Sequence, residues 1–336
     1  MNIKPLISFD IVLSVFNQEN LIERVLYGIF KNTTTPFNLI MVFDGCTDRT
    51  EARARAYIKK YKSRHLKQFL ATTAPNVYET RANNIGFKLA KSDYMITLQD
   101  DMVITEYGWE RRLTYPLRKF DDVLAVTARA AHNIDRLEGY EHYYTERMER
   151  ALGTLPRDIF AVRDIINRGP VAFNMNHLRT MNFLNEAYAP SDLDDADLSL
   201  RAWKQHKLRV GAYWINYLSP LHWGKSRMTD SSMQVGKSIS RNADRIMKDH
   251  SDYLSTKIKH TEDIKIPENE VDYVGIRPYK LPSFFYRPVR IYKKEIVRLI
   301  NLFRDGIKDI LFTLLERLGI KGAREHGFRK LLKISK

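Results

Sequence analysis

The sequence predicts an α/β protein built on a mainly parallel sheet flanked by helices. Between residues 9 and 98, apolar β-rich runs alternate with segments of helical spacing. Each apolar run ends in a polar turn. The composition, with 44% hydrophobic and 28% charged residues, is that of an ordinary globular protein and excludes wholesale disorder. Such an alternation is typical of parallel sheets, because each strand needs a crossover segment to return to the same edge.

The expected elements follow one another in a regular order. The apolar run FDIVLSV at 9–15 is the first expected strand, and FNLIMVF at 37–43 is the second. Two further strands are expected at 67–71 and 93–98. The spacing of apolar residues predicts helices between them, at 20–30, 48–61 and 80–90, the second with Thr47 or Asp48 as its N-cap.

The charge balance indicates an anionic partner. The 336 residues include 55 Lys and Arg against 40 Asp and Glu, which gives a net charge of +15. Residues 281–336 alone contain 14 Lys and Arg and five Asp and Glu, so most of the surplus lies in the last sixth of the chain. A surplus of this kind favours nucleic acid, anionic lipid or phosphorylated ligands as partners.

The sequence also predicts a cytoplasmic location. The single cysteine, Cys46, excludes an intrachain disulfide and favours a reducing compartment. Charged residues interrupt every apolar stretch before the roughly 18 residues that a membrane-spanning helix needs. The first apolar run contains Asp10 and no small-residue cleavage site, so we interpret it as a strand and not as a signal peptide.

Three polar turns follow the expected strands and form the candidate site. They are Phe16-Asn17-Gln18-Glu19, Asp44-Gly45-Cys46-Thr47-Asp48 and Gln99-Asp100-Asp101. Ligands of open α/β sheets bind beyond the carboxyl ends of the strands, where these turns are expected to meet. An isolated pair of aspartates is usually a solvated turn or a helix cap. Together, the three turns predict an acidic pocket for a divalent cation, Mn²⁺ or Mg²⁺, and the phosphates that it holds.

In this order, the motifs resemble those of the inverting nucleotide-sugar glycosyltransferases of family 2, which have the GT-A fold. The resemblance runs from about residue 8 to about residue 227 and includes SVFNQE, MVFDGCTDRT, TRANNIGFKLAKSDYMITLQDD and LDDADLSLRAWKQHKLRV. It implies a GT-A, Rossmann-like fold with a donor half at about 1–103 and an acceptor half at about 104–230. It also implies that Asp101 holds the metal. The residues that it assigns to the nucleotide sugar are Phe16, Asn17, Glu19, Asp44, Arg81, Asn84 and Asp100.

The segment LDDADLSLR resembles the E-D-x-D-L-x-x-R motif of the family. The resemblance implies that Asp195 is the catalytic base, with Asp194, Asp197 and Arg201 in supporting positions. The capping of a helix N-terminus is the plain alternative for this acidic cluster. Farther on, His222 resembles a late histidine that ligates the metal in related enzymes, or it is a packed histidine beside Trp223. Lys225 and Arg227 are expected to screen the diphosphate, unless they are simply solvated.

The region 276–336 is predicted to be a basic helical extension that follows a catalytic domain at 1–275. Between 292 and 318, apolar residues recur every three or four positions, flanked by Lys and Arg. Such a stripe fits a helix lying on an anionic membrane surface through residues 284–336, on the inner face of the membrane. The alternatives are packing on the catalytic domain or in a homodimer interface.

These observations together predict a metal-dependent inverting glycosyltransferase. It would move a sugar from a nucleotide-diphosphate sugar, with a UDP-sugar as the first expectation, to a hydroxyl of a glycan or lipid-linked acceptor. The family context implies a role in polysaccharide or glycoconjugate assembly. A nucleotidyltransferase would need a glycine- and lysine-containing phosphate loop after the first strand, which SVFNQE lacks. A nucleic-acid-binding protein is the other alternative, but the sequence contains no nucleic-acid-binding motif, so no nucleic-acid partner is expected.

Overall fold

The computed structural model describes residues 3–61, 63–133, 148–150, 155–219, 235–255 and 261–271. All of these residues belong to one compact unit, Met1–Tyr279, and the second unit, Lys280–Lys336, lies outside them. The boundary expected near residue 275 and the basic helical extension therefore stay predictions. In the described part of the chain, no helix combines the length and the apolar character needed to cross a bilayer.

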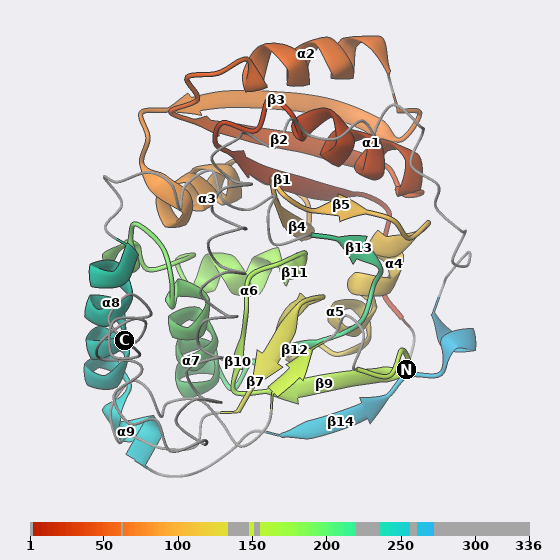
Figure 1. The fold of residues 1–336 in the computed structure, drawn as a ribbon. Coiled ribbons are helices and arrows are strands. Elements are labelled where there is room, and N and C mark those ends of the chain that lie inside the picture. The colour runs from red at the N-terminus through yellow and green to blue at the C-terminus, as the bar shows by residue number, and fades with distance from the viewer. Residues whose placement is uncertain are drawn as a thin grey trace, which may run out of the picture. The chain divides into compact units, whose positions relative to one another are not determined.

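The centre of the described unit is a nine-stranded sheet with the order β14-β9-β12-β6-β11-β4-β1-β2-β3 (Figure 1). Its strands are β1 Phe9–Val15, β2 Phe37–Asp44, β3 Leu66–Ala74, β4 Tyr94–Gln99, β6 Val123–Thr127, β9 Ile159–Arg163, β11 Val171–Asn174, β12 Arg209–Ala212 and β14 Glu262–Lys265. Two small sheets accompany it, formed by β10 Ile165–Ile166, β7 Ala130–His132 and β8 Met148–Arg150, and by β13 Tyr217–Leu218 and β5 Val103–Ile104.

The strands β3, β2, β1 and β4 form what we call the parallel half of the sheet. Every adjacent pair among them is parallel. Val15 lies opposite Phe43 of β2, and Ser14 lies opposite Gln99 of β4. Because these residues stand at or next to the strand ends, the turns that follow β1, β2 and β4 lie at the same edge of the sheet.

The strands β11, β6, β12, β9 and β14 form the mixed half. β11 is antiparallel to β4 on one side and to β6 on the other. β12 is parallel to β6 but antiparallel to β9, which is antiparallel to β14. The architecture predicted from the sequence, a large, mostly parallel sheet with flanking helices, is confirmed.

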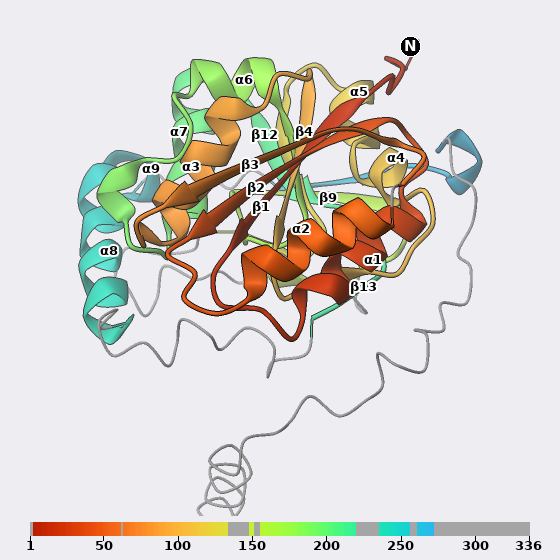
Figure 2. The same cartoon turned by 90° about the horizontal axis from the view of Figure 1, so that it is seen from above.

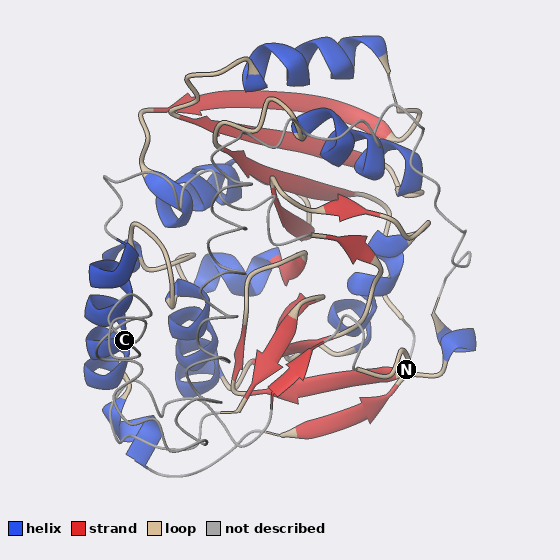
Figure 3. Ribbon diagram, viewed as in Figure 1, coloured by secondary structure: helices blue, strands red, loops and turns tan. Residues whose placement is uncertain are grey.

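The helices cover both faces of the sheet, as the ribbons in Figures 2 and 3 show. They are α1 Ile22–Asn32, α2 Thr50–Lys60, α3 Tyr78–Leu89, α4 Trp109–Leu113, α5 Tyr115–Lys119, α6 Met175–Thr180, α7 Asp194–His206, α8 Val235–Asp249 and α9 Ser251–Ser255, with 3₁₀ turns at Glu186–Tyr188 and Glu268–Glu270.

The alternation of side chains along β1 distributes two cores over the two faces. Ile11 and Leu13 belong to the apolar cluster of α1 and α2, whereas Val12 belongs to the cluster that contains Phe87 of α3. Gly86 lets α3 approach the sheet closely, because a Cβ atom there would lie 2.4 Å from Cγ1 of Val12. The tight fit of α3 against β1 fixes the height at which the first turn of α3 meets the ends of the strands.

The four strands and three helices expected between residues 9 and 98 are all present, with ends that differ by up to three residues. The expected N-cap of α2 is wrong. The cap residue is Arg49, without a side-chain cap bond, and α2 begins at Thr50. Asp48 instead accepts the N–H of Thr50, at 2.9 Å, and the N–H of Glu19, at 3.1 Å. Its carboxylate therefore joins the start of α2 to the turn after β1.

Candidate functional site

A pocket of about 970 Å³, continuous with solvent, lies at the carboxyl ends of β1 and β4. Four residues predicted from the sequence line it together: Phe16, Asp100, Asp101 and Asp195. Phe16 and the two aspartates follow strands of the parallel half, whereas Asp195 stands in the first turn of α7. The structure thus brings the predicted metal turn and the predicted base to one cavity.

Asp100 ties the turn after β4 to the turn after β1. Its Oδ2 accepts the N–H of Phe16 at 2.8 Å, and its Oδ1 accepts from Nε2 of Gln18 at 3.4 Å. Burial raises the pKa of Asp100 to about 7, and the neighbouring Asp101 adds to the rise, while the two hydrogen bonds oppose it. Asp100 therefore fixes the main chain at Phe16, which lines the pocket.

Asn17 and Glu19 connect the turn after β1 to the turn after β2. Oδ1 of Asn17 accepts the N–H of Thr47 at 2.8 Å, and Oε2 of Glu19 accepts from Nε of Arg49 at 3.1 Å. Asn17 has a positive φ of 50°, a conformation that asparagine tolerates better than most residues. Neither residue lines the pocket, so the structure places both as links between turns.

Asp44 also lies outside the lining of the pocket. It is completely buried at the end of β2, and its Oδ1 accepts the N–H of Val77 at 2.6 Å. The next residue, Gly45, has a φ of +68°, and a Cβ atom there would lie 2.6 Å from Cβ of Asn76. The turn after β2 is thus packed tightly against the segment that enters α3.

On α3, the pocket is lined by Glu79 and Asn83 and not by the predicted Arg81 and Asn84. The amide of Asn84 donates to the carbonyl of Leu184 at 2.8 Å, and Nε of Arg81 lies 3.6 Å from Oε2 of Glu186. Arg81 and Asn84 therefore connect α3 to the segment between α6 and α7. The helical spacing of Glu79, Asn83 and Phe87, which lie on one face of α3, is the signal that could have identified the first two.

Asp101 fits a divalent cation. Oδ1 of Asp101 is buried and has no hydrogen-bond partner among the residues described. Burial, followed by the charge of Glu79, raises the pKa of Asp101, while Arg129 opposes the rise. No group of three or more His, Cys, Asp or Glu side chains suited to a metal occurs in the described ranges. Mg²⁺ is often bound by one or two carboxylates together with substrate phosphates, so Asp101 beside Asp100 suffices for such a site.

The predicted base, Asp195, lies in the first turn of α7, as the sequence indicated. Its Oδ2 accepts the N–H of Arg168 and its Oδ1 accepts the N–H of Ala196, both at 2.8 Å. Burial raises the pKa of Asp195 to about 6, and the adjacent Asp194 raises it further. The positive charge of Arg168 and the two N–H groups oppose the rise. A carboxylate with this pKa is ionised at neutral pH and still able to take up a proton.

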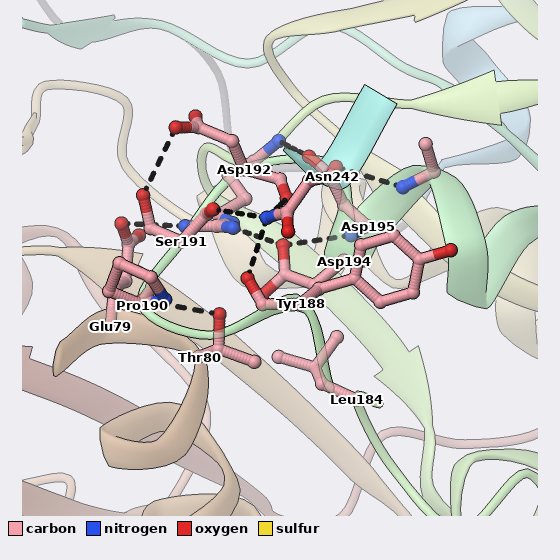
Figure 4. A network of polar contacts seen from close by, with 12 residues as sticks. Glu79, Thr80, Leu184, Tyr188, Pro190, Ser191, Asp192, Asp194, Asp195 and Asn242 are labelled. Atoms are coloured by element: carbon pink, nitrogen blue, oxygen red, sulfur yellow. Dashed lines mark hydrogen bonds and ion pairs between the residues drawn. The ribbon is translucent and has the colours of Figure 1, made fainter. Parts of the chain in front are cut away.

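The loop that leads into α7 is held by a buried amide. Nδ2 of Asn242, on α8, donates to the carbonyl oxygens of Tyr188, Ser191 and Asp192 at 2.7–2.9 Å, as Figure 4 shows. Asp192 and Leu193 have positive φ values of 74° and 64°. Two consecutive residues in the left-handed backbone region cost conformational free energy, so the loop needs the support that Asn242 provides. No motif or spacing in the sequence pointed to Asn242.

Asp197 and Arg201 lie behind the site and outside the lining of the pocket. Asp197 accepts from Nε of Arg201 at 2.7 Å and lies 2.9 Å from Nε2 of the buried His250. Arg201 also donates to the carbonyl oxygens of Met181 and Phe183. These contacts join α7 to the end of α6 and to the segment between α8 and α9. Asp197 and Arg201 therefore help to hold α7, the helix that carries Asp195, in place.

Asp194 and Arg168 form an ion pair beside Asp195. Asp194 is completely buried; its Oδ1 accepts from Nη2 of Arg168 and accepts the N–H of Asp195 at 2.9 Å. Arg168 lies 2.6 Å from Oε2 of Glu79, whose Oε1 accepts from Nε2 of Gln99 at 2.9 Å. Arg168 was not among the predicted residues, because a single arginine in front of a strand forms no recognisable pattern. The expected His222, Lys225 and Arg227 lie outside the described residues.

Comparisons with solved structures give distant similarities. A structure of GalNAc-T7 with UDP, GalNAc and Mn²⁺ is 13% identical, has a TM-score of 0.47 and covers 62% of this chain and 42% of that chain. The mannosyltransferase PcManGT from Pyrobaculum calidifontis, in complex with GDP-Man and Mn²⁺, is 13% identical and has a TM-score of 0.43. The match covers 62% of this chain and 57% of that chain. Glucosyl-3-phosphoglycerate synthase from Mycobacterium tuberculosis, in complex with Mn²⁺, UDP-glucose and phosphoglyceric acid, is 16% identical and has a TM-score of 0.44. The match covers 78% of this chain and 90% of that chain.

The chain thus spans less than half of the GalNAc-T7 chain. No curated protein sequence matches it. A family model, described as glycosyl transferase family 2, matches residues 10–183, which is more than half of the 336 residues. The match includes all three turns of the candidate site and Arg168, and it ends before α7. The chain belongs to glycosyl transferase family 2, as its motifs predicted.

Proposed function

We propose that this protein is a metal-dependent inverting glycosyltransferase that uses a nucleotide-diphosphate sugar. The observation that carries the proposal is the shared pocket of Phe16, Asp100, Asp101 and Asp195. Membership of glycosyl transferase family 2 supports the transfer of a glycosyl group. A UDP-sugar is the donor that we would test first, and a hydroxyl of a glycan or lipid-linked molecule is the acceptor.

The residues divide the chemistry between donor and acceptor. Phe16 offers an aromatic face to the nucleobase at the rim of the pocket. Asp101, with Asp100 beside it, would hold a Mn²⁺ or Mg²⁺ ion on the diphosphate. When bound, such an ion supplies Lewis-acid stabilisation of the charge that develops on the leaving diphosphate. The unpartnered oxygen of Asp101 suits this role, because a bound cation would compensate its buried charge.

Asp195 is the group that we propose as the base. It accepts the proton of the acceptor hydroxyl while the hydroxyl oxygen bonds to the anomeric carbon and the bond to the diphosphate breaks. A single displacement of this kind inverts the anomeric configuration. The carboxylate is held by two main-chain N–H groups, at Arg168 and Ala196, so it is oriented before the substrate arrives.

The direct test combines binding and product analysis. Thermal unfolding of the full chain would be followed with UDP, GDP and their sugars, each with and without Mn²⁺, because a ligand of the folded state raises its Tm. The donor found in this way would then be offered to glycan and lipid-linked alcohols, and NMR would identify the anomeric configuration of the product. We expect metal-dependent stabilisation and inversion. The absence of any nucleotide-dependent shift, or a product with retained configuration, would contradict the proposal.

We further propose that residues 284–336 bring the enzyme to an anionic membrane surface during polysaccharide or glycoconjugate assembly. The basic surplus of residues 281–336 and their apolar periodicity support this. Removal of 284–336 should release the protein from phosphatidylserine-containing vesicles while leaving nucleotide binding unchanged. If the shortened chain still binds the vesicles, the membrane proposal is wrong. A change from dimer to monomer in sedimentation would instead favour the homodimer alternative.

A further inference from the structure

Arg168 is the one cation among the described residues that line the pocket. It follows β10 in the short connection to β11, and its side chain is only 15% exposed. The same lining contains four carboxylates, those of Glu79, Asp100, Asp101 and Asp195. A buried guanidinium in such a setting is expected to bind carboxylates, because its N–H groups form a planar fork that matches them.

The contacts of Arg168 join three elements of the fold. Nη1 lies 2.6 Å from Oε2 of Glu79, which belongs to the first turn of α3. Nη2 donates to Oδ1 of Asp194, in the first turn of α7. The main-chain N–H of Arg168 donates to Oδ2 of Asp195 at 2.8 Å. Arg168 therefore holds both members of the Asp194–Asp195 pair, one through its side chain and the other through its backbone.

The chain of contacts continues into the parallel half. Oε1 of Glu79 accepts from Gln99, the last residue of β4, which directly precedes Asp100. A continuous polar path thus runs from the end of β4 through Glu79 and Arg168 to Asp195. Figure 4 draws Glu79, Asp194 and Asp195 as parts of this network. Arg168 thus connects the donor side of the pocket to the proposed base, through its guanidinium on Glu79 and its main-chain N–H on Asp195.

The charges around Asp195 explain why a cation is needed here. Asp195 faces Asp194 on its own helix and Arg168 on the neighbouring loop, while Glu79 and Asp192 face Arg168. Asp100 and Asp101 line the same pocket. Two adjacent carboxylates repel each other, and a cation beside them favours the ionised form.

We propose that Arg168 is a positioning residue for Asp195. Its main-chain N–H orients the carboxylate, and its guanidinium offsets the charge of Asp194 so that Asp195 stays ionised and ready to accept a proton. This inference rests on the proposed role of Asp195 as the base. It gives Arg168 a task that a purely structural ion pair would not have, since the protonation of Asp195 depends on it.

The test measures the protonation of Asp195 directly and needs no substrate. The full chain would carry aspartate labelled with carbon-13 at the carboxyl carbon, and the signal of Asp195 would be identified by its loss in Asp195→Asn. In Arg168→Gln, the pKa of Asp195 should rise by roughly one pH unit, because an opposite charge at close range has been removed. Arg168→Lys keeps the charge and should restore part of the wild-type value. Asp194→Asn should lower the pKa of Asp195, because the repelling neighbour is gone.

A matched control is available in Arg209. Its side chain is 12% exposed and, like Arg168, it pairs with two carboxylates, those of Asp122 and Glu262, but it does not line the pocket. Arg209→Gln should lower Tm without moving the titration of Asp195. If Arg168→Gln leaves the titration at the wild-type position, the proposal is overturned. If that variant does not fold, an unchanged titration in Asp194→Asn overturns it equally.

The outcomes separate this inference from the proposed function. Glycosyl transfer that survives in Asp195→Asn would contradict the role of Asp195 as the base, whatever the titrations show. An inactive Asp195→Asn together with titrations that do not respond to Arg168 or Asp194 would overturn only the role of Arg168.

Discussion

The two halves of the sheet contribute to the pocket in different ways. In the parallel half, Phe16, Asp100 and Asp101 follow their strands directly, and hydrogen bonds between neighbouring turns fix their positions. Next to the mixed half, Arg168 stands on a short connection and pairs with Glu79 and Asp194. Asp195 stands at a helix N-terminus, where main-chain N–H groups hold its carboxylate and Asn242 holds the preceding loop. The comparison indicates that the turns proposed for the donor hold one another at adjacent strand ends, whereas the loop before the proposed base is held by a side chain from a separate helix, α8.

The largest expected effect separates the two halves by function. Asp195→Asn removes the proposed base but keeps a side chain of the same shape, so transfer should fall by about 10²–10⁴-fold. Metal-dependent binding of the nucleotide, which we assign to the parallel half, should change little. Steady-state kinetics and calorimetric titration of the nucleotide with Mn²⁺ would measure the two effects. If transfer and nucleotide binding fall equally, Asp195 belongs to the donor site and is not the base for the acceptor.

The reverse experiment removes the proposed metal ligand. Asp101→Asn should weaken metal-dependent nucleotide binding by about 2–5 kcal/mol, because one partner of a buried charge pair is lost. Without metal, the same variant should be about 1 kcal/mol more stable to urea than the wild type, because a neutral amide replaces a buried carboxylate of which one oxygen has no hydrogen-bond partner. Asp93→Asn, at the exposed amino end of β4, is the control and should change stability by less than about 0.5 kcal/mol. Full Mn²⁺ dependence in Asp101→Asn would contradict the assignment.

The two halves also differ in how much of their structure could be predicted from the sequence. The strands at 9–15 and 37–43 were predicted almost residue by residue, because each is a continuous apolar run that ends in a polar turn. The strands of the mixed half are mostly four or five residues long and pair across large sequence separations, which periodicity does not report. The mostly parallel α/β architecture could therefore be predicted, but the order of its outer strands could not.

Within the candidate site, the same limit applies to single residues. Phe16, Asp100, Asp101 and Asp195 could be identified because they belong to recognisable motifs. On α3, the prediction named Asn84, whereas Asn83 lines the pocket, a difference of one residue that turns a side chain by about 100° around a helix. Arg168 and Asn242 act through contacts with distant segments, so they could be found only once the fold was known.

The support that α8 gives to the loop before Asp195 can be tested through Asn242. Asn242→Ala leaves three buried carbonyl oxygens without the amide that they share, which should cost about 1–3 kcal/mol of unfolding free energy. It should also lower kcat, because the loop before Asp195 is no longer held, while the affinity for the nucleotide stays unchanged. Asn174→Ala removes the N-cap of α6, at the opposite edge of the sheet, and serves as the control. It should reduce stability by about 1 kcal/mol without changing kcat. An equal fall of kcat in both variants would assign the effect of Asn242 to general instability.

The smallest expected effect is the pH dependence of the wild-type enzyme. Asp195 acts as a base only when it is ionised, and burial raises its pKa to about 6. Activity should therefore be near its plateau at pH 8, about half of it near pH 6, and fall about tenfold for each further pH unit. The profile should be that of kcat/KM for the acceptor, because kcat/KM reports on Asp195 before the acceptor binds. Saturating donor and Mn²⁺ should keep the carboxylates of the parallel half ionised during this measurement. An acidic limb near pH 4, the ordinary range of an aspartate, would mean that substrate does not preserve the buried environment of Asp195. Such a limb would contradict the raised pKa that we expect for the proposed base.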